Sequence, residues 1–330
     1  ASVRGPGPWF GVCNGASVPL PGGCAFADRP IDLHLKGFEA LGAAVRVENG
    51  NVKVVAPKLH GAVINLRGKF GPTVLGTDNV MMAAVLADGT TVIEGAAAEP
   101  EVCDLADFLN KMGAKIEGAG TRRIIIEGVA ELHGAEHTVI PDRIETGTFL
   151  VAGAICGQGI TLNRVVPEHV LSVTNALTEG GFKIECTKDS ISVSPNGATP
   201  KALELTTDPY PGFPTDMQAQ MCALLSTTQG ISTITENVFP QRYMHVAELK
   251  RMGANVNLED ATAVIEGVDH LLGAPVMASD LRASAALVLA GLKAEGVTEL
   301  SRVYHIDRGY EHLDEKLSEL GAHIERVKSE

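Results

Sequence analysis

The sequence predicts an α/β protein that repeats a unit of about 70 residues, with buried helices covered by sheets. A first motif, a helix that ends at a glycine and leads into an alternating strand, recurs at Gly42, Gly113, Gly181, Gly253 and Gly321. A second motif, an apolar helix followed by a glycine and a strand rich in Thr, Val and Ile, has its glycine at Gly89, Gly159, Gly230 and Gly296. The helices of the second motif are apolar on every side, as in residues 283–292. Such helices are buried on every side.

Each motif glycine can adopt the left-handed conformation that ends a helix and turns the chain. The residues after it alternate in polarity or are β-branched, which favours strands. Each unit therefore reads helix, strand, strand, helix, strand. A glycine after a helix is common in any αβ protein, but its recurrence at one period favours a true repeat. The pattern predicts an architecture and leaves the function open.

Composition limits the classes of function. The 330 residues predict two domains, which we place at residues 1–140 and 141–330. The net charge of −13, without a basic stretch, argues against a nucleic-acid partner, although a few Arg and Lys residues can still bind small anions. The six cysteines show no metal-binding spacing, so we expect no metal site and a reducing, cytoplasmic environment. No apolar stretch is long enough to span a bilayer.

One cysteine differs from the others in its surroundings. Cys24 follows the turn Pro21-Gly22-Gly23 and lies close in sequence to Arg29. A thiol in a flexible loop near a cation can have a lowered pKa and act as a nucleophile or a general acid. Taken alone, an ordinary loop cysteine is the more frequent explanation.

Four further segments combine acidic residues with helix starts. In residues 213–220, Thr215 or Asp216 can cap the following helix, or Asp216 can act as a general base. Residues 141–148, 279–284 and 305–310 each place Asp beside Arg. As surface ion pairs they would mean little. Together they would supply guanidinium groups that bind phosphate and carboxylate bidentately. The sequence has no P-loop, no dinucleotide fingerprint, no zinc-protease motif and no serine-hydrolase motif.

The combined motifs at residues 20–34, 141–149, 213–220, 280–287 and 304–311 resemble those of the UDP-N-acetylglucosamine 1-carboxyvinyltransferases. The resemblance extends from about residue 16 to residue 328. It implies an EPSP synthase-like fold of two inside-out α/β barrel domains, three repeats in each, with the active site in the cleft between them. Six repeats need about 420 residues. We therefore expect a segment before Ala1 that holds the family's Lys-Asn pair and a substrate-binding Arg.

The family's reaction transfers the enolpyruvyl group of phosphoenolpyruvate to the 3′-hydroxyl of UDP-N-acetylglucosamine and releases phosphate. It is the first committed step of peptidoglycan synthesis and needs neither a metal nor an organic cofactor. By resemblance, Cys24 is the general acid, which can also form an adduct with phosphoenolpyruvate. Asp216 handles the proton of the sugar hydroxyl, and Arg308 is the third catalytic residue.

The resemblance also implies binding residues. Phosphoenolpyruvate would be held by Cys24, Arg29, Arg282 and Arg308. UDP-N-acetylglucosamine would be held by Arg29, Pro30, Ile31, Asp32, Leu33, Lys69, Thr73, Val74, Asp216 and Val238. Supporting positions in the cleft would be Glu101, Asp142, Arg242 and Asp280.

Two stretches depart from the family pattern. The phosphate-binding turn at residues 71–77 is longer than usual, and Thr73 and Val74 are the best matches in it. Pro6 and Pro8 disfavour the usual helix near the start, so we expect the first 15 or so residues to be irregular. Two alternatives stay open: a UDP-sugar-binding fragment with impaired catalysis, and a transferase that acts on shikimate 3-phosphate. The sequence makes no prediction of the oligomeric state.

Overall fold

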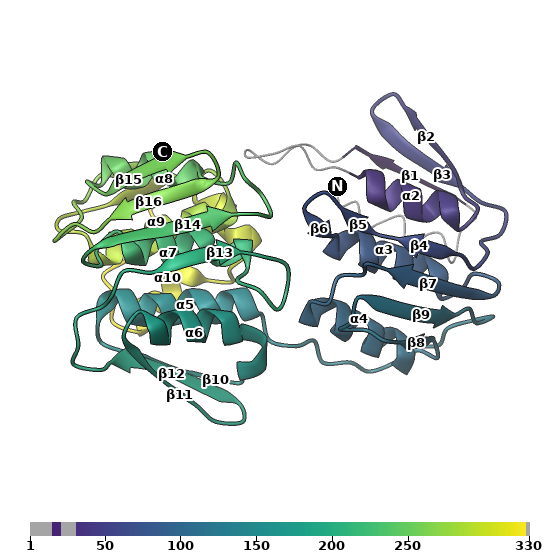
Figure 1. Cartoon of the computed structure of the whole chain (residues 1–330), viewed down its shortest axis with the longest axis horizontal. Coiled ribbons are helices and arrows are strands. Elements are labelled where there is room, and N and C mark those ends of the chain that lie inside the picture. Colours follow the sequence, from purple (N-terminus) through teal and green to yellow (C-terminus); the bar gives the residue numbers. More distant parts are fainter. Residues whose placement is uncertain (1–14, 21–30, 328–330) are drawn as a thin grey trace. The chain divides into compact units, whose positions relative to one another are not determined.

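The computed structural model describes residues 15–20 and 31–327 (Figure 1). The predictions for Cys24, Arg29, Pro30 and the irregular first residues therefore lie outside the described residues. The described chain divides into two compact units. Unit 1 comprises residues 15–20, 31–140 and 209–211, and unit 2 comprises residues 141–208 and 212–327. That these units are the two domains implied by the resemblance stays a prediction.

In its described residues, unit 1 packs helices against antiparallel and mixed sheets. Its helices are α2 (Asp32–Ala40), α3 (Val74–Ala84) and α4 (Pro100–Lys111). Its strands are β1 (Gly15–Pro19), β2 (Ala44–Glu48), β3 (Asn51–Val55), β4 (Val63–Asn65), β5 (Arg67–Gly68), β6 (Gly71–Pro72), β7 (Thr90–Glu94), β8 (Lys115–Glu117) and β9 (Arg123–Glu127). They form sheets with the orders β1-β3-β2, β4-β7-β9-β8 and β5-β6.

Unit 2 repeats the same plan with more helices. Its helices are α5 (Arg143–Cys156), η1 (Pro167–Val170), α6 (Leu171–Glu179), η2 (Thr215–Met217), α7 (Gln218–Leu225), α8 (Met244–Arg251), α9 (Leu281–Lys293), η3 (Val303–Arg308) and α10 (Leu313–Glu319). Its strands are β10 (Ile160–Asn163), β11 (Phe182–Cys186), β12 (Ser190–Pro195), β13 (Glu204–Thr207), β14 (Ile231–Glu236), β15 (Asn255–Glu259), β16 (Thr262–Glu266), β17 (Pro275–Met277) and β18 (Glu299–Ser301). Its sheet orders are β10-β12-β11, β13-β14-β16-β15 and β17-β18.

The structure confirms the predicted repeat. The sheet β4-β7-β9-β8 in unit 1 and the sheet β13-β14-β16-β15 in unit 2 have the same order, with a parallel first pair and antiparallel pairs after it. All nine motif glycines have positive φ angles, from 79° at Gly159 to 102° at Gly230. A side chain at such an angle would be strained, which explains why glycine recurs there.

The helices of the second motif are the buried ones, as predicted. Every residue of α7 is buried, and most of α3, α5 and α9 is buried as well. In unit 2, the three helices α5, α7 and α9 contact one another (Figure 1). Each unit has a hydrophobic core of its own in the described residues. Small residues such as Ala and Gly in these helices allow this close packing.

One predicted strand is absent from the described residues. The sequence pattern placed a strand after Gly321, but residues 322–327 form none. At the other four glycines of the first motif, the strand after the glycine pairs antiparallel with the strand that follows it, as β15 pairs with β16. The described residues after Gly321 include no such second strand. A strand without a hydrogen-bonding partner is not stable.

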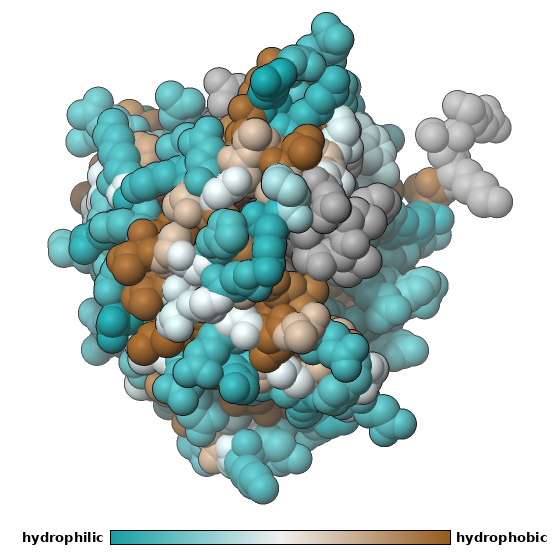
Figure 2. Space-filling model, turned by 90° about the vertical axis from the view of Figure 1, so that its right-hand side faces the viewer, coloured by the Kyte–Doolittle hydropathy of each residue, from teal (hydrophilic) through white to brown (hydrophobic). Residues whose placement is uncertain are grey.

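The described residues have no membrane-spanning helix, and their exposed hydrophobic side chains are not confined to one unit. In the described part of the chain, helices are too short or too polar to cross a membrane. Figure 2 shows one face on which hydrophobic residues lie between polar ones. The strongly exposed hydrophobic side chains include Val63 and Val297, which lie in different units.

A close backbone contact at Gly128 predicts a strongly destabilising substitution. Gly128 follows β9, and its N–H donates to the carbonyl of Gly89 at 3.0 Å. A Cβ atom at Gly128 would overlap the carbonyl oxygen of Ala87, which belongs to the backbone and cannot rotate away. We expect Gly128→Ala to lower the free energy of unfolding by about 3 kcal/mol or more, measured by urea unfolding. Gly134→Ala is the matched control, because an added Cβ there contacts nothing. Equal stability of the two variants would contradict the prediction.

Candidate active site

Asp216 lies at the centre of a group of charged side chains in unit 2. Its Oδ1 atom accepts a hydrogen bond from Arg242 Nη1 at 2.6 Å, and its Oδ2 atom lies 3.5 Å from Arg282 Nη2. The prediction that Thr215 or Asp216 caps the next helix is wrong, because neither side chain accepts a hydrogen bond from a helix amide. The carboxylate of Asp216 faces the two guanidinium groups instead.

The arginines keep Asp216 ionised. Loss of hydration alone would raise its pKa, but Arg242 and Arg282 outweigh that effect and lower the pKa to about 2. The side chain of Asp216 still has 37% of its surface exposed, so a small molecule can reach it. An ionised, accessible carboxylate can accept a hydrogen bond from a hydroxyl group and receive its proton.

Asp280 positions Arg282 at the start of α9. The carboxylate of Asp280 accepts hydrogen bonds from the N–H groups of Arg282 at 2.7 Å and Ala283 at 3.2 Å. Such capping fixes the first turn of a helix. Asp142 caps α5 in the same way, through the N–H groups of Ile144 and Glu145. Both residues were predicted to support the site.

Arg282 is buried and retains unused donors. Only 8% of the residue is exposed, and its guanidinium carbon lies 5.2 Å from the ring centre of Tyr310. Burial would lower the pKa of Arg282, but Asp216 and Tyr310 raise it above the usual value. Its Nε and Nη1 atoms have no hydrogen-bond partner among the described residues. Buried donors of this kind are costly unless an anion binds them.

A buried hydrogen-bond network fixes Tyr310 beside Arg282. The hydroxyl groups of Tyr310 and Thr148 lie 2.9 Å apart. The Nε2 atom of Gln220 donates to Thr148 Oγ1 at 3.0 Å and to the carbonyl oxygen of Asp216 at 2.8 Å. The network therefore connects α5, α7 and the segment after η3 to the residues around Asp216.

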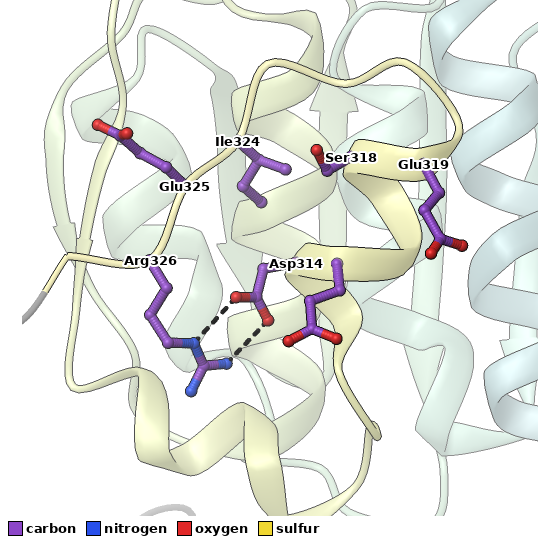
Figure 3. A pocket seen from close by; sticks show the side chains of 7 residues that line it. Asp314, Ser318, Glu319, Ile324, Glu325 and Arg326 are labelled. Atoms are coloured by element: carbon purple, nitrogen blue, oxygen red, sulfur yellow. Dashed lines mark hydrogen bonds and ion pairs between the residues drawn. The ribbon is translucent and has the colours of Figure 1, made fainter.

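Arg308 is separate from this group. It ends η3, is exposed, and forms no ion pair with Asp216. The preceding Asp307 is held by Arg326, whose Nη1 and Nη2 atoms donate to it at 2.9 and 2.8 Å. Arg326 also contacts Asp314 in the recess of Figure 3. The structure therefore fixes the backbone beside Arg308 but leaves its side chain in solvent.

Unit 1 brings several predicted nucleotide-sugar residues to neighbouring helix starts. Asp32 and Leu33 begin α2, and Thr73 caps α3 by accepting a hydrogen bond from the N–H of Gly76 at 3.1 Å. Lys69 lies in the turn between β5 and β6, and Leu33 packs directly against Gly68 of that hairpin.

Four other predicted residues lie in or beside different elements of the two units. They are Ile31 just before α2, Val74 at the start of α3, Glu101 in the first turn of α4, and Val238 after β14. The assignment of all these side chains to substrate binding stays a prediction.

His34 in α2 contacts the middle of α3 and predicts a pH effect. Its Nδ1 atom lies 2.8 Å from Asn79 Nδ2, inside the core. Burial lowers the pKa of His34 to about 4, although Asp32 raises it slightly. Burial and Arg242 lower the pKa of His245 to about 3. The unfolded chain therefore binds more protons than the folded chain below about pH 6.5. We expect stability to fall as the pH decreases from about 6.5 to about 4.

The measurement is urea unfolding across this pH range. His34→Gln removes one titrating group, so its free energy of unfolding should depend less on pH than that of the unchanged protein. We expect this variant to be less stable than the unchanged protein at neutral pH. His60→Gln alters an exposed histidine of the same unit and serves as the control. A His34→Gln variant with an unchanged pH slope would contradict the prediction.

Sequence reasoning missed Glu236. It ends β14, where Ser232, Ile234 and Glu236 are the buried residues of the alternating pattern. A carboxylate at the third inward position, where an apolar residue is expected, was the available signal. Within the described residues, no group of His, Cys, Asp or Glu is arranged to hold a metal ion.

Comparisons with known proteins agree with the resemblance found in the sequence. The profile of the EPSP synthase (3-phosphoshikimate 1-carboxyvinyltransferase) family matches residues 1–317. The chain is 60% identical over 330 residues to the UDP-N-acetylglucosamine 1-carboxyvinyltransferase of Akkermansia muciniphila, covering 99% of this chain and 77% of that protein. It is 57% identical over 329 residues to the protein of that name from Methylacidiphilum infernorum, covering 100% of this chain and 78% of that protein.

Solved structures have the same fold. The enolpyruvyl transferase NikO from Streptomyces tendae matches with a TM-score of 0.83 at 24% identity, covering 95% of this chain and 74% of that one. An EPSP synthase from Acinetobacter baumannii matches with a TM-score of 0.73 at 18% identity, covering 99% and 79%. These matches confirm the predicted EPSP synthase-like fold.

Proposed function

Because this chain belongs to the UDP-N-acetylglucosamine 1-carboxyvinyltransferase family, within the EPSP synthase-like enolpyruvyl transferases, we propose that it catalyses that family's reaction. The substrates are phosphoenolpyruvate and UDP-N-acetylglucosamine, and the products are phosphate and the enolpyruvyl sugar nucleotide. The observation that supports this most strongly is the 60% identity to the Akkermansia muciniphila protein over 330 residues. The product enters peptidoglycan synthesis, which places the protein in cell wall biogenesis and in the cytoplasm.

The reaction has two steps. In the first, the 3′-hydroxyl oxygen of the sugar bonds to C2 of phosphoenolpyruvate, C3 gains a proton, and the hydroxyl proton leaves. In the second, the tetrahedral intermediate loses phosphate from C2 and a proton from C3, which restores the double bond. We assign Asp216 as acceptor of the hydroxyl proton and Cys24 as donor to C3. The assignment of Asp216 is supported by its carboxylate, which is ionised and accessible.

Arg282 is assigned to phosphoenolpyruvate. It is buried, charged, and has two nitrogens without partners among the described residues. A guanidinium group binds carboxylate and phosphate oxygens in a fork, which suits this doubly anionic substrate. Arg308, which is exposed, would need to move its side chain to take part.

The test is phosphate release by the full-length protein. We expect release only when phosphoenolpyruvate and UDP-N-acetylglucosamine are both present. No release under these conditions would refute the proposal. Intact-mass measurement of the purified protein, against 34.6 kDa for these 330 residues, shows which segment is being assayed.

The second candidate acceptor is shikimate 3-phosphate. The matching family profile bears the name of the enzyme that uses it, so this acceptor is assayed in parallel. Release of phosphate with shikimate 3-phosphate and not with UDP-N-acetylglucosamine would favour this second reaction.

A further inference from the structure

A buried carboxylate outside the predicted site residues is linked through Thr215 to the charged group at Asp216. Glu236 is fully buried at the end of β14. Burying an ionised carboxylate costs several kcal/mol unless hydrogen bonds or cations compensate for it. The hydrogen-bond partners of Glu236 therefore indicate what its burial does for the structure.

The two oxygens of Glu236 have different partners. Oε1 accepts hydrogen bonds from Thr207 Oγ1 at 2.7 Å and from the N–H groups of Val238 and Phe239, each at 2.9 Å. Oε2 accepts one from Thr215 Oγ1 at 2.9 Å. Glu236 therefore holds the segment after β14 with one oxygen and the residue before Asp216 with the other.

The hydrogen bonds from Glu236 continue to Asp216. Thr215 donates its hydroxyl proton to Glu236, so the lone pairs of that hydroxyl face its other neighbour. That neighbour is Arg242 Nη1, which donates to Thr215 Oγ1 at 3.2 Å. The same nitrogen donates to Asp216 Oδ1 at 2.6 Å. The Glu236 oxygen that accepts this hydrogen bond thus fixes the direction of the Thr215 hydroxyl, and that hydroxyl fixes the Arg242 guanidinium.

We propose that Glu236 is a positioning residue for the transfer reaction, acting through Thr215 and Arg242 on the orientation of the Asp216 carboxylate. This inference rests on the proposed function of Asp216. Glu236 is fully buried and reaches Asp216 through Thr215 and Arg242, so its role is to position the site and not to react. Its effect is to keep the guanidinium of Arg242 in the one geometry that leaves the other oxygen of Asp216 facing Arg282.

The first variant is Glu236→Gln, which keeps the shape and removes the charge. An amide keeps one oxygen for the N–H groups of Val238 and Phe239, so its NH₂ group must face Thr215. The Thr215 hydroxyl can then no longer donate to residue 236, and its proton turns toward Arg242, which is also a donor. We expect kcat to fall about 10- to 100-fold, because a misplaced catalytic group costs about this much, while KM changes less than threefold.

Two further variants separate positioning from a general loss of structure. Glu236→Asp keeps the charge and should recover several-fold of the activity lost in Glu236→Gln. Thr215→Val removes the connecting hydroxyl, so the double variant with Glu236→Gln should lose little more than either single variant. Glu259→Gln, at the exposed end of strand β15 in the same sheet, is the matched control and should behave like the unchanged protein.

A measurement without substrate distinguishes this inference from the proposed function. Carbon-13 NMR titration of the ligand-free protein follows the carboxyl group of Asp216 directly. Loss of a negative charge at residue 236 would by itself lower the pKa of Asp216, whereas displacement of the Arg242 guanidinium raises it. If Glu236 positions Arg242, we therefore expect the pKa of Asp216 to rise in Glu236→Gln and to stay unchanged in Glu259→Gln. An unchanged Asp216 titration, or losses that simply add in the double variant, would overturn the inference. Absence of phosphate release by the unchanged protein, with the expected NMR shift, would overturn only the proposed function.

Discussion

Asp216→Asn is expected to lower kcat by about 10²- to 10⁴-fold, the usual contribution of a positioned general base. The carboxylate is ionised and accessible, whereas an amide of the same shape cannot take up a proton. The substitution also leaves Arg242 and Arg282 without the negative charge they share. The KM for phosphoenolpyruvate should therefore stay the same or fall, because the site becomes more positive. Steady-state kinetics with each substrate varied gives both quantities.

The control for this variant is Asp260→Asn. Asp260 lies in the exposed turn between β15 and β16 with a φ of 53°, a conformation that Asn also tolerates. It should leave kcat and KM unchanged. A kcat for Asp216→Asn within tenfold of the unchanged protein would refute the assignment of Asp216 as the proton acceptor.

The ionisation of Asp216 also predicts the form of the pH profile. A pKa of about 2 lies well below the usual value near 3.8, so Asp216 stays charged in the free protein above about pH 4. The profile of kcat/KM, which reports the free enzyme, should therefore show no ionisation of Asp216 between pH 4 and pH 8. The stability that Asp216 contributes is present above about pH 4 and is lost as the pH falls toward 2.

The fold was more predictable from sequence than the site. Glycine at Gly42, Gly113 and Gly181 indicates helix ends because only glycine tolerates the positive φ angles found there. Apolar helices such as α7 predict burial because a polar face is missing. Both signals are local in the sequence. The prediction of a strand directly after Gly321 was wrong for residues 322–327, because strand formation depends on a partner strand, which a local pattern does not contain.

The candidate site depends on contacts between residues far apart in the sequence. The motif around Asp216 was recognisable, but its ion pair with Arg242 and its approach to Arg282 come from three separate segments. The same is true of Glu236, whose carboxylate binds Thr207 and Thr215 from a different strand and turn. No spacing rule within one segment indicates such pairs. The approach of Asp216 to Arg282 follows from the contact between the buried helices α7 and α9, because the two residues lie near the starts of these helices.

Arg282→Lys is expected to lower kcat/KM for phosphoenolpyruvate by about 10²- to 10³-fold, the range seen when one donor to a developing charge is removed. Lysine keeps the positive charge but not the planar fork that binds two oxygens at once. Among the described residues, Arg282 Nε and Nη1 have no acceptor, and lysine has no atoms at those positions. The loss should therefore arise in substrate binding and in stabilisation of phosphate as it leaves, even though the charge is preserved.

Two comparisons show whether this loss comes from the fork. Arg282→Met removes the charge as well and should cost more than Arg282→Lys, while Asp216 keeps its ion pair with Arg242 and the fold is retained. Arg251→Lys, on the exposed face of α8, should leave kcat/KM unchanged. If Arg282→Lys retained full kcat/KM, the bidentate assignment would be wrong and a point charge would suffice. If Lys and Met lost equally, the geometry of the fork would account for the whole contribution of Arg282.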